Sequence, residues 1–194
     1  MPQPRAFVRG RRASGTFQTN LRLAMDLSKH LRDVPDFPKP GILFKDITPL
    51  LAHPAAMKEA IHRLAALDYG KIHCVAAIES RGFLFGAPLA MQLGIGFVPI
   101  RKPGKLPWKT NRVEYVLEYG TDAVEIHQDA VHKGQRVLLV DDLLATGGTM
   151  GAACKLVESC GATVAGCAFV VELGFLPGRS KLAPHRVDSL IRVD

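Results

Sequence analysis

The stretch that decides the fold reads Val137-Leu138-Leu139-Val140-Asp141-Asp142-Leu143-Leu144-Ala145-Thr146-Gly147-Gly148-Thr149. Its apolar beginning predicts a strand over residues 136–140 that is buried on both faces. The threonine and glycine residues after the two acids predict a loop that opens a helix. In an open parallel sheet, ligands bind where the strands reach their carboxyl ends. The junction after residue 140 is therefore the first candidate for a binding site.

The loop over residues 145–149 has the composition of a phosphate cradle. Gly147 and Gly148 put no side chain between the backbone N–H groups and an anion, and the N-terminus of the following helix adds partial positive charge. Thr146 and Thr149 add hydroxyl donors. The loop lacks the Lys-Ser/Thr ending of a Walker loop, and the chain lacks the G-x-G-x-x-G dinucleotide fingerprint.

Two adjacent carboxylates, Asp141 and Asp142, precede this loop. They would repel a bare polyphosphate, so we expect them to accept hydrogen bonds from sugar hydroxyls and to help place Mg²⁺. A phosphate beside a sugar diol describes a ribose 5-phosphate. The alternative is a plain strand–turn–helix junction in which the acids cap the helix. We favour the binding site, because the whole thirteen-residue pattern meets each ligand requirement in register.

The rest of the chain alternates helical and strand patterns. The predicted helices cover residues 27–34, 54–67, 82–93 and 148–160, and the further predicted strands cover 73–78, 95–100 and 163–172. A cationic loop over residues 101–112 comes before a possible hairpin made of 113–117 and 123–126. The alternation predicts an α/β fold with a mostly parallel, twisted sheet flanked by helices.

Composition predicts one compact domain over residues 26–194, because the chain has 194 residues and is 47% hydrophobic. The net charge of +7 is concentrated in residues 1–25, which hold five arginines and no acid, so the remainder carries only +2. We therefore expect no nucleic-acid surface. No apolar run reaches the roughly 18–20 residues that span a bilayer, and we expect no membrane partner. The four cysteines show no metal-ligand spacing and are expected to be free thiols.

Residues 1–25 are rich in arginine, serine and threonine and lack a continuous apolar core. This composition fits a disordered extension, a stretch upstream of a start at Met25, or an organelle transit peptide. We favour an extension, because no helical apolar face persists, and with it a cytoplasmic location.

The segment over residues 137–149 resembles the signature of the type I phosphoribosyltransferases, and its form resembles the branch of that family that acts on adenine. The resemblance extends from about Leu27 to Leu182. Further matching stretches, in the same order along the chain, are Phe37-Pro38-x-Pro40-Gly41-Ile42-x-Phe44-x-Asp46-Ile47, Glu79-Ser80-Arg81-Gly82-Phe83, Arg101-Lys102-x-Gly104-Lys105-Leu106-Pro107, Tyr115-x-Leu117-Glu118-Tyr119-Gly120 and Glu172-Leu173-x-x-Leu176-x-Gly178-Arg179. The resemblance implies the family fold with a small hood and flexible loop, and a homodimer. It also implies Mg²⁺-dependent transfer of the phosphoribosyl group from phosphoribosyl pyrophosphate to adenine, giving AMP and pyrophosphate.

A second anion site is expected where Glu79-Ser80-Arg81-Gly82 follows a buried strand and opens a helix. The N–H groups there and the Arg81 guanidinium suit pyrophosphate. The resemblance identifies this segment as the family's pyrophosphate loop, which often holds a non-proline cis peptide. The alternative for Arg81 is a surface ion pair.

The resemblance also assigns the remaining site residues. It places the family's flexible hood over Arg101 to Trp108 and makes Lys102 and Lys105 pyrophosphate contacts, although a solvated basic loop is the alternative. Glu118 takes the position of the family's acid/base, where the alternative is a hairpin surface residue. The expected phosphoribosyl pyrophosphate ligands are Ser80, Arg81, Lys102, Lys105, Asp141, Asp142, Ala145, Thr146, Gly147, Gly148 and Thr149. The expected catalytic groups are Glu118, Arg81 and Lys105, with Mg²⁺ held through the substrate near Asp141.

Phe44, Lys45 and Leu143 correspond to the family's base pocket, where Phe44 would stack on the purine and the Lys45 backbone would contact its edge. Lys45 stands where the family more often has arginine. Composition alone would place Phe44 in the core. Two rivals remain: the same chemistry with hypoxanthine, guanine or another base, and a non-enzymatic sensor that keeps the phosphoribosyl site to regulate transcription. The hood cations, Glu118 and the low charge of the body favour the enzyme.

Overall fold

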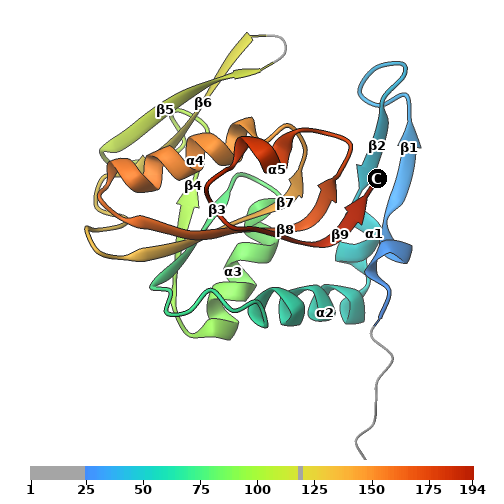
Figure 1. Ribbon diagram of the computed structural model, residues 1–194, viewed down its shortest axis with the longest axis horizontal. Helices are drawn as coiled ribbons and strands as arrows, with labels where there is room; N and C mark the ends of the chain where they lie inside the picture. The colour runs from blue at the N-terminus through green and yellow to red at the C-terminus, as the bar shows by residue number, and fades with distance from the viewer. Residues whose placement is uncertain (1–24, 118–119) are drawn as a thin grey trace, which may run out of the picture.

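The structure is a computed structural model that describes residues 25–117 and 120–194. Its centre is a five-stranded sheet in the order β4-β3-β7-β8-β9, and every neighbouring pair is parallel. The strands are β3 (Cys74–Ile78), β4 (Gly96–Ile100), β7 (Arg136–Leu144), β8 (Thr163–Leu173) and β9 (Val187–Val193). The parallel sheet flanked by helices confirms the predicted fold class (Figure 1).

Helices cover both faces of this sheet. The helices α2 (Pro54–Ala65) and α3 (Gly82–Leu93) lie on one face, and α4 (Gly148–Ser159) and α5 (Gly178–Lys181) lie on the other (Figure 1). Residues 137–140 of β7 are therefore buried on both faces: Leu139 packs in the cluster with α4, and Leu138 packs in the cluster with α2 and α3. Burial on both faces explains the continuous apolar run in the sequence.

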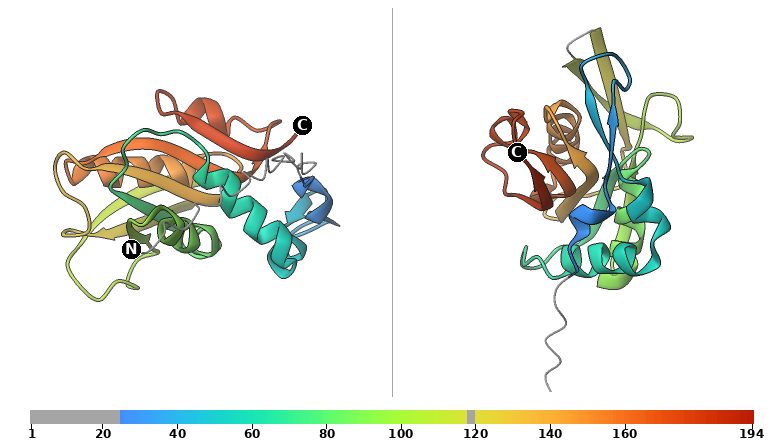
Figure 2. Two further views of the ribbon diagram at one scale, coloured as in Figure 1. Left: turned by 90° about the horizontal axis from the view of Figure 1, so that it is seen from below. Right: turned by 90° about the vertical axis from the view of Figure 1, so that its right-hand side faces the viewer.

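Two antiparallel hairpins accompany the sheet. β1 (Arg32–Pro35) pairs with β2 (Leu43–Asp46), and β5 (Thr110–Leu117) pairs with β6 (Gly120–His127). The β5–β6 hairpin packs on α4, and both hairpins extend to the same side of the molecule (Figures 1 and 2). A short 3-10 helix η1 (Leu27–His30) precedes β1, and α1 (Thr48–Ala52) follows β2.

Several predicted boundaries were wrong. The helix expected over residues 27–34 ends at His30, because residues 32–35 instead form a strand against β2. The strand expected to end at Val140 continues to Leu144, because β8 runs alongside it and supplies backbone partners. Asp141 and Asp142 thus lie inside β7 rather than in the loop after it. β9 was not predicted, and neither were β1 and β2.

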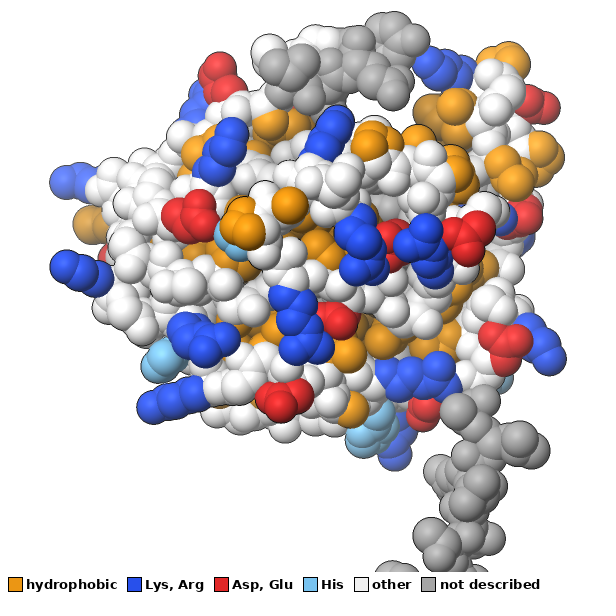
Figure 3. Space-filling view, viewed as in Figure 1, with side chains coloured by type: hydrophobic (Ala, Val, Ile, Leu, Met, Phe, Trp, Pro, Cys, Tyr) orange, Lys and Arg blue, Asp and Glu red, His pale blue; other side chains and the backbone are white. Residues whose placement is uncertain are grey.

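The described surface mixes both signs of charge. Lys and Arg side chains are spread over the face in Figure 3, and several lie directly beside Asp or Glu side chains. In residues 25–117 and 120–194, no helix has both the length and the apolar character needed to span a membrane.

Candidate functional site

The predicted phosphate loop leaves β7 at Leu144 and enters α4 at Gly148. It borders a cavity of about 90 Å³. The cavity is lined by Asp141, Leu143, Leu144, Ala145, Thr146, Gly147, Gly148, Thr149, Met150 and Phe169. The loop residues therefore face open space and leave room for an anion at the N-terminus of a twelve-residue helix.

Two glycines from different elements shape this loop. Gly147 has φ 78°, in the left-handed region, and a Cβ on it would lie 2.7 Å from the Gly178 carbonyl oxygen. A Cβ on Gly178, the first residue of α5, would in turn run into the Ala145 carbonyl oxygen. The loop and α5 therefore touch backbone to backbone, which only glycine permits at both positions.

The two acids lie in different environments, and of the two only Asp141 lines the cavity. Asp142 is 3% exposed, and its Oδ2 is 2.9 Å from Arg81 Nε. Burial raises the pKa of Asp142, although the Arg81 charge opposes this shift. Burial and the neighbouring Asp142 charge together raise the pKa of Asp141. Two carboxylates confined side by side form a site that a cation or hydroxyl donors would stabilise.

The expected Mg²⁺ is compatible with this pair. Within the described residues, no three His, Cys, Asp or Glu side chains gather as a metal cage. Mg²⁺ is commonly held by one or two carboxylates together with substrate phosphates and water. Asp141 supplies one carboxylate at the candidate phosphate cradle, and Asp142 is its neighbour in β7.

The second anion loop lies against the same acids. A Cβ on Gly82 would lie 2.8 Å from Asp141 Oδ1, so the start of α3 packs directly on the end of β7. The Glu79–Ser80 peptide bond is cis, as the family resemblance implies. The Arg81 side chain is 42% exposed and forms its ion pair with buried Asp142. Arg81 thus joins the two loops that sequence analysis assigned to one substrate.

Two cations of the hood, Arg101 and Lys105, converge on one carboxylate, Glu79. Arg101 donates to both of its oxygens at 3.2 Å, the Lys102 amide donates at 3.1 Å, and Lys105 Nζ donates at 2.6 Å. Partial burial raises the pKa of Glu79, but these contacts outweigh it and bring the pKa down to about 2. In this conformation, Glu79 holds Lys105, one of the two hood lysines that were expected to contact pyrophosphate.

Tyr115 connects the hood to the phosphate loop. Its hydroxyl accepts hydrogen bonds from Lys102 Nζ at 2.9 Å and from Thr149 Oγ1 at 3.1 Å, and it donates to Asp122. Lys102 is also ion-paired with Asp122. Sequence analysis noted Tyr115 in a matching stretch but assigned no role to it, to Asp122 or to Glu79. Tyr115 and Asp122 face each other across the β5–β6 hairpin, whereas Glu79 follows β3 and contacts the hood, so no spacing pattern relates these residues.

The residues expected to hold the base, Phe44, Lys45 and Leu143, have the following surroundings. The Phe44 ring lies edge-on to Phe37 with centroids 5.1 Å apart, and the Arg81 guanidinium lies 5.6 Å from the Phe44 centroid. The Lys45 side chain points to Asp33, 2.6 Å away, which leaves its backbone as the expected contact. Leu143 lines the cavity of the phosphate loop. Glu118 lies outside the described residues.

Comparisons with known proteins show the family of the chain and its fold. Residues 46–190 match the phosphoribosyl transferase domain family. The adenine phosphoribosyltransferase of Methylococcus capsulatus is 58% identical over 166 residues, which cover 85% of this chain and 97% of that protein. The crystal structure of adenine phosphoribosyltransferase from Thermoanaerobacter pseudethanolicus has a TM-score of 0.84 at 58% identity and covers 86% of this chain and 98% of that one.

A more distant solved structure carries ligands. The adenine phosphoribosyltransferase of Trypanosoma brucei, in complex with AMP, pyrophosphate and ribose-5-phosphate, has a TM-score of 0.77 at 27% identity. The alignment covers 86% of this chain and 77% of that one.

Proposed function

Because this chain belongs to the phosphoribosyl transferase domain family, we propose that it transfers the phosphoribosyl group of phosphoribosyl pyrophosphate to adenine, giving AMP and pyrophosphate in purine salvage. The observation that carries the proposal is the cavity at residues 145–149. It opens beside the Asp141–Asp142 pair, which Arg81 ties to the second anion loop. A phosphoribosyl donor needs a phosphate site, acceptors for its ribose hydroxyls and a pyrophosphate site close together.

The ribose 5-phosphate end of the substrate occupies the cradle. Inward-facing amides of residues 145–149 and the hydroxyls of Thr146 and Thr149 bind the phosphate oxygens. Asp141 and Asp142 accept hydrogen bonds from the ribose hydroxyls. For Thr149 this requires that its hydroxyl, now bonded to Tyr115, turn to the phosphate.

The pyrophosphate end lies at the loop formed by Ser80 and Arg81. Lys102 and Lys105 leave Asp122 and Glu79 to bind the pyrophosphate, so the hood exchanges internal carboxylates for the substrate anion. Closing the hood excludes water and surrounds the departing charge with fixed cations.

In the transfer step, the imidazole-ring nitrogen of adenine attacks the anomeric carbon. A carbon–nitrogen bond forms while the bond from that carbon to the pyrophosphate oxygen breaks, and the bonding electrons leave with pyrophosphate. Glu118 accepts the proton that the attacking nitrogen loses. Phe44, the Lys45 backbone and Leu143 hold the base in line with the sugar, because correct positioning supplies much of the rate in such a displacement.

We propose Mg²⁺ as the cofactor, held near Asp141 through the substrate. When bound, it neutralises phosphate charge and assists the departure of pyrophosphate. The Asp141–Asp142 pair supports this assignment.

One assay separates this proposal from its rivals: pyrophosphate release measured with adenine, hypoxanthine and guanine in turn, with and without Mg²⁺. We expect release with adenine, lost when the metal is chelated. Release with hypoxanthine or guanine alone would assign a different base. No release with any base would favour a sensor.

We further propose a cytoplasmic homodimer. Exposed Leu84 and Met91, seven residues apart on α3, give one face of that helix apolar surface for a second copy. Light scattering coupled to size exclusion tests the dimer, and a monomer at all concentrations would contradict it.

A further inference from the structure

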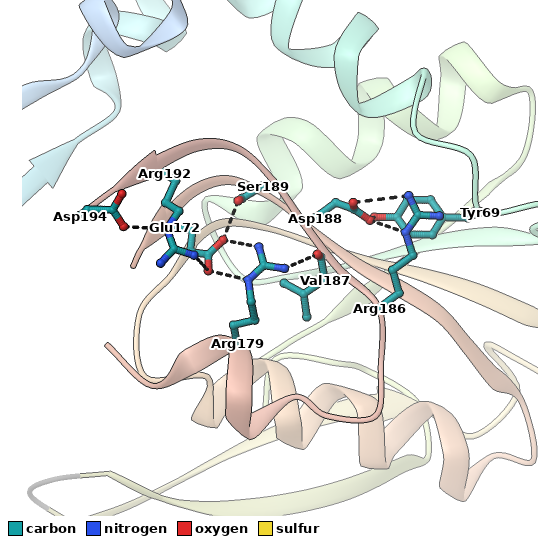
Figure 4. Close-up of polar contacts among 9 residues, drawn as sticks. All are labelled: Tyr69, Glu172, Arg179, Arg186, Val187, Asp188, Ser189, Arg192 and Asp194. Carbon is teal, nitrogen blue, oxygen red and sulfur yellow. Dashed lines mark hydrogen bonds and ion pairs between the residues drawn. The ribbon is translucent and has the colours of Figure 1, made fainter. Parts of the chain in front are cut away.

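A buried carboxylate, Glu172, lies next to the phosphate loop without belonging to it. Glu172 is 2% exposed and pairs in the sheet with Leu144, the last residue of β7 before the loop. Arg179 Nε donates to Glu172 Oε1 at 2.8 Å, Arg179 Nη2 donates to Oε2, and Ser189 Oγ donates to Oε2 at 2.6 Å (Figure 4). A buried carboxylate with this many donors has one strongly favoured geometry.

Arg179 also reaches a third element. Its Nη1 donates to the Val187 carbonyl oxygen at 2.6 Å, so one guanidinium joins α5 to both β8 and β9 (Figure 4). The planar fork of arginine makes this triple contact possible, and a lysine in its place would satisfy only part of it.

The helix that carries Arg179 is too short to hold its own position. α5 has four residues, and isolated helices of that length are not stable in water. Its place therefore depends on tertiary contacts, of which the Arg179 contacts with Glu172 and Val187 are the charged ones. Gly178 is the residue before Arg179, and its backbone is the surface against which Gly147 and Ala145 pack.

We propose that Arg179 and Glu172 are positioning residues for the phosphate loop. Their ion pair holds the Gly178 backbone against residues 145–147 and so keeps the loop amides directed into the cavity. This inference rests on the proposed function, because it assumes that the cavity binds the 5′-phosphate. If α5 is released, the loop loses its support and phosphate binding weakens, whereas the base pocket at Phe44 does not contact α5 and retains its affinity.

The test compares two arginines that are both visible in Figure 4. The Arg186 side chain is 48% exposed, and that of Arg179 is 45% exposed. Arg186 pairs with Asp188 on β9, the strand that also holds Val187 (Figure 4). Its other partners, Tyr69 and the Asp68 carbonyl oxygen, belong to the segment before β3. Arg179→Met and Arg186→Met therefore remove equivalent side chains, and only the first should act on the loop.

The measurements are the dissociation constant of AMP by calorimetry and the steady-state constants for both substrates, at a temperature well below each melting transition. For Arg179→Met we expect the AMP dissociation constant and the KM for phosphoribosyl pyrophosphate to rise about tenfold, with kcat and the KM for adenine nearly unchanged. Arg186→Met should leave all four values near those of the wild type. Arg179→Lys should recover part of the AMP affinity, because it restores the ion pair without the Val187 contact.

Three results would overturn the inference. The first is equal AMP affinity in Arg179→Met and wild type, and the second is an equal loss of AMP affinity in both methionine variants. The third is a loss in Arg179→Met that raises the KM for adenine as much as that for phosphoribosyl pyrophosphate. Failure of the wild type to bind AMP would instead refute the proposed function, and the inference with it. If Arg179→Met does not fold, Glu172→Gln keeps the Ser189 contact, removes only the charge, and is expected to weaken AMP binding about threefold.

Discussion

Lys105 Nζ lies 2.6 Å from Glu79 Oε1, so a cation of the hood is neutralised by the first residue of the expected pyrophosphate loop. Arg101 shares the same carboxylate. The Lys105 side chain is half exposed, so it can exchange its partner. We therefore interpret Glu79 as the resting partner of cations that turn to pyrophosphate when the substrate binds.

Replacing Lys105 tests the hood assignment. We expect Lys105→Met to lower kcat about 100-fold, because a fixed donor to the departing charge is lost. The KM for adenine should change far less. Lys155→Met, at an exposed position on α4, is the control and should behave as wild type. Equal losses in turnover and adenine binding would contradict the assignment.

Replacing Glu79 tests its role as an anchor. In Glu79→Gln the side chain keeps its shape but loses the charge that attracts Arg101 and Lys105. We expect faster amide hydrogen exchange over residues 101–106, with no change in α2. Unchanged exchange in the hood segment would show that these ion pairs do not order it.

The contact between Gly147 and Gly178 is tested against a second glycine. Gly147→Ala and Gly134→Ala both place a side chain at positive φ, 78° and 85°, which costs about 1–2 kcal/mol of stability. A Cβ on Gly134 meets nothing within 4 Å, whereas one on Gly147 meets Gly178. Only Gly147→Ala should also weaken AMP binding, by at least about tenfold. Equal AMP affinity in the two variants would place the phosphate elsewhere.

Phe44 is expected to bind the base through its ring. Phe44→Leu should raise the KM for adenine about fivefold, the equivalent of roughly 1 kcal/mol of aromatic stacking, and leave the KM for phosphoribosyl pyrophosphate unchanged. Phe175→Leu, at an exposed phenylalanine outside the expected base pocket, serves as the control. If Phe44 instead serves only in the core, Phe44→Leu should lower the melting temperature without changing the ratio of the KM for adenine to the KM for phosphoribosyl pyrophosphate.

Glu172 contributes stability that depends on pH. The Arg179 contacts bring its pKa down to about 2 from the usual 4.5, so its ionised form is favoured in the folded protein. The contribution of ionised Glu172 to the free energy of unfolding is nearly complete above about pH 4.5 and is lost as the pH falls towards 2. The difference in free energy of unfolding between wild type and Glu172→Gln should therefore shrink by about 1 kcal/mol between pH 6 and pH 3.5, as measured by urea denaturation. A difference that is constant over this range would contradict the shifted pKa.

Most of the architecture was predictable because it depends on local pattern. The continuous apolar runs at β3, β4, β7 and β8 predicted buried parallel strands, and α3 was predicted with both its boundaries. β1 and β2 were missed because each is a four-residue strand that exists only through pairing with the other. The extension of β7 through Asp141 and Asp142 was missed for a related reason. Charged residues rarely continue a buried strand, but here β8 supplies backbone partners that keep these residues in the strand conformation.

The two expected anion loops could be recognised from the sequence, since each is a contiguous run whose glycines, hydroxyls and charges act through the local backbone. Family resemblance then supplied the roles of Lys102, Lys105 and the base-pocket residues. Only the tertiary structure decided what these groups contact: Arg81 with Asp142, Lys105 with Glu79, and Gly178 with Gly147. Such contacts join segments from 26 to 61 residues apart, and chain folding alone brings them within hydrogen-bond or van der Waals distance.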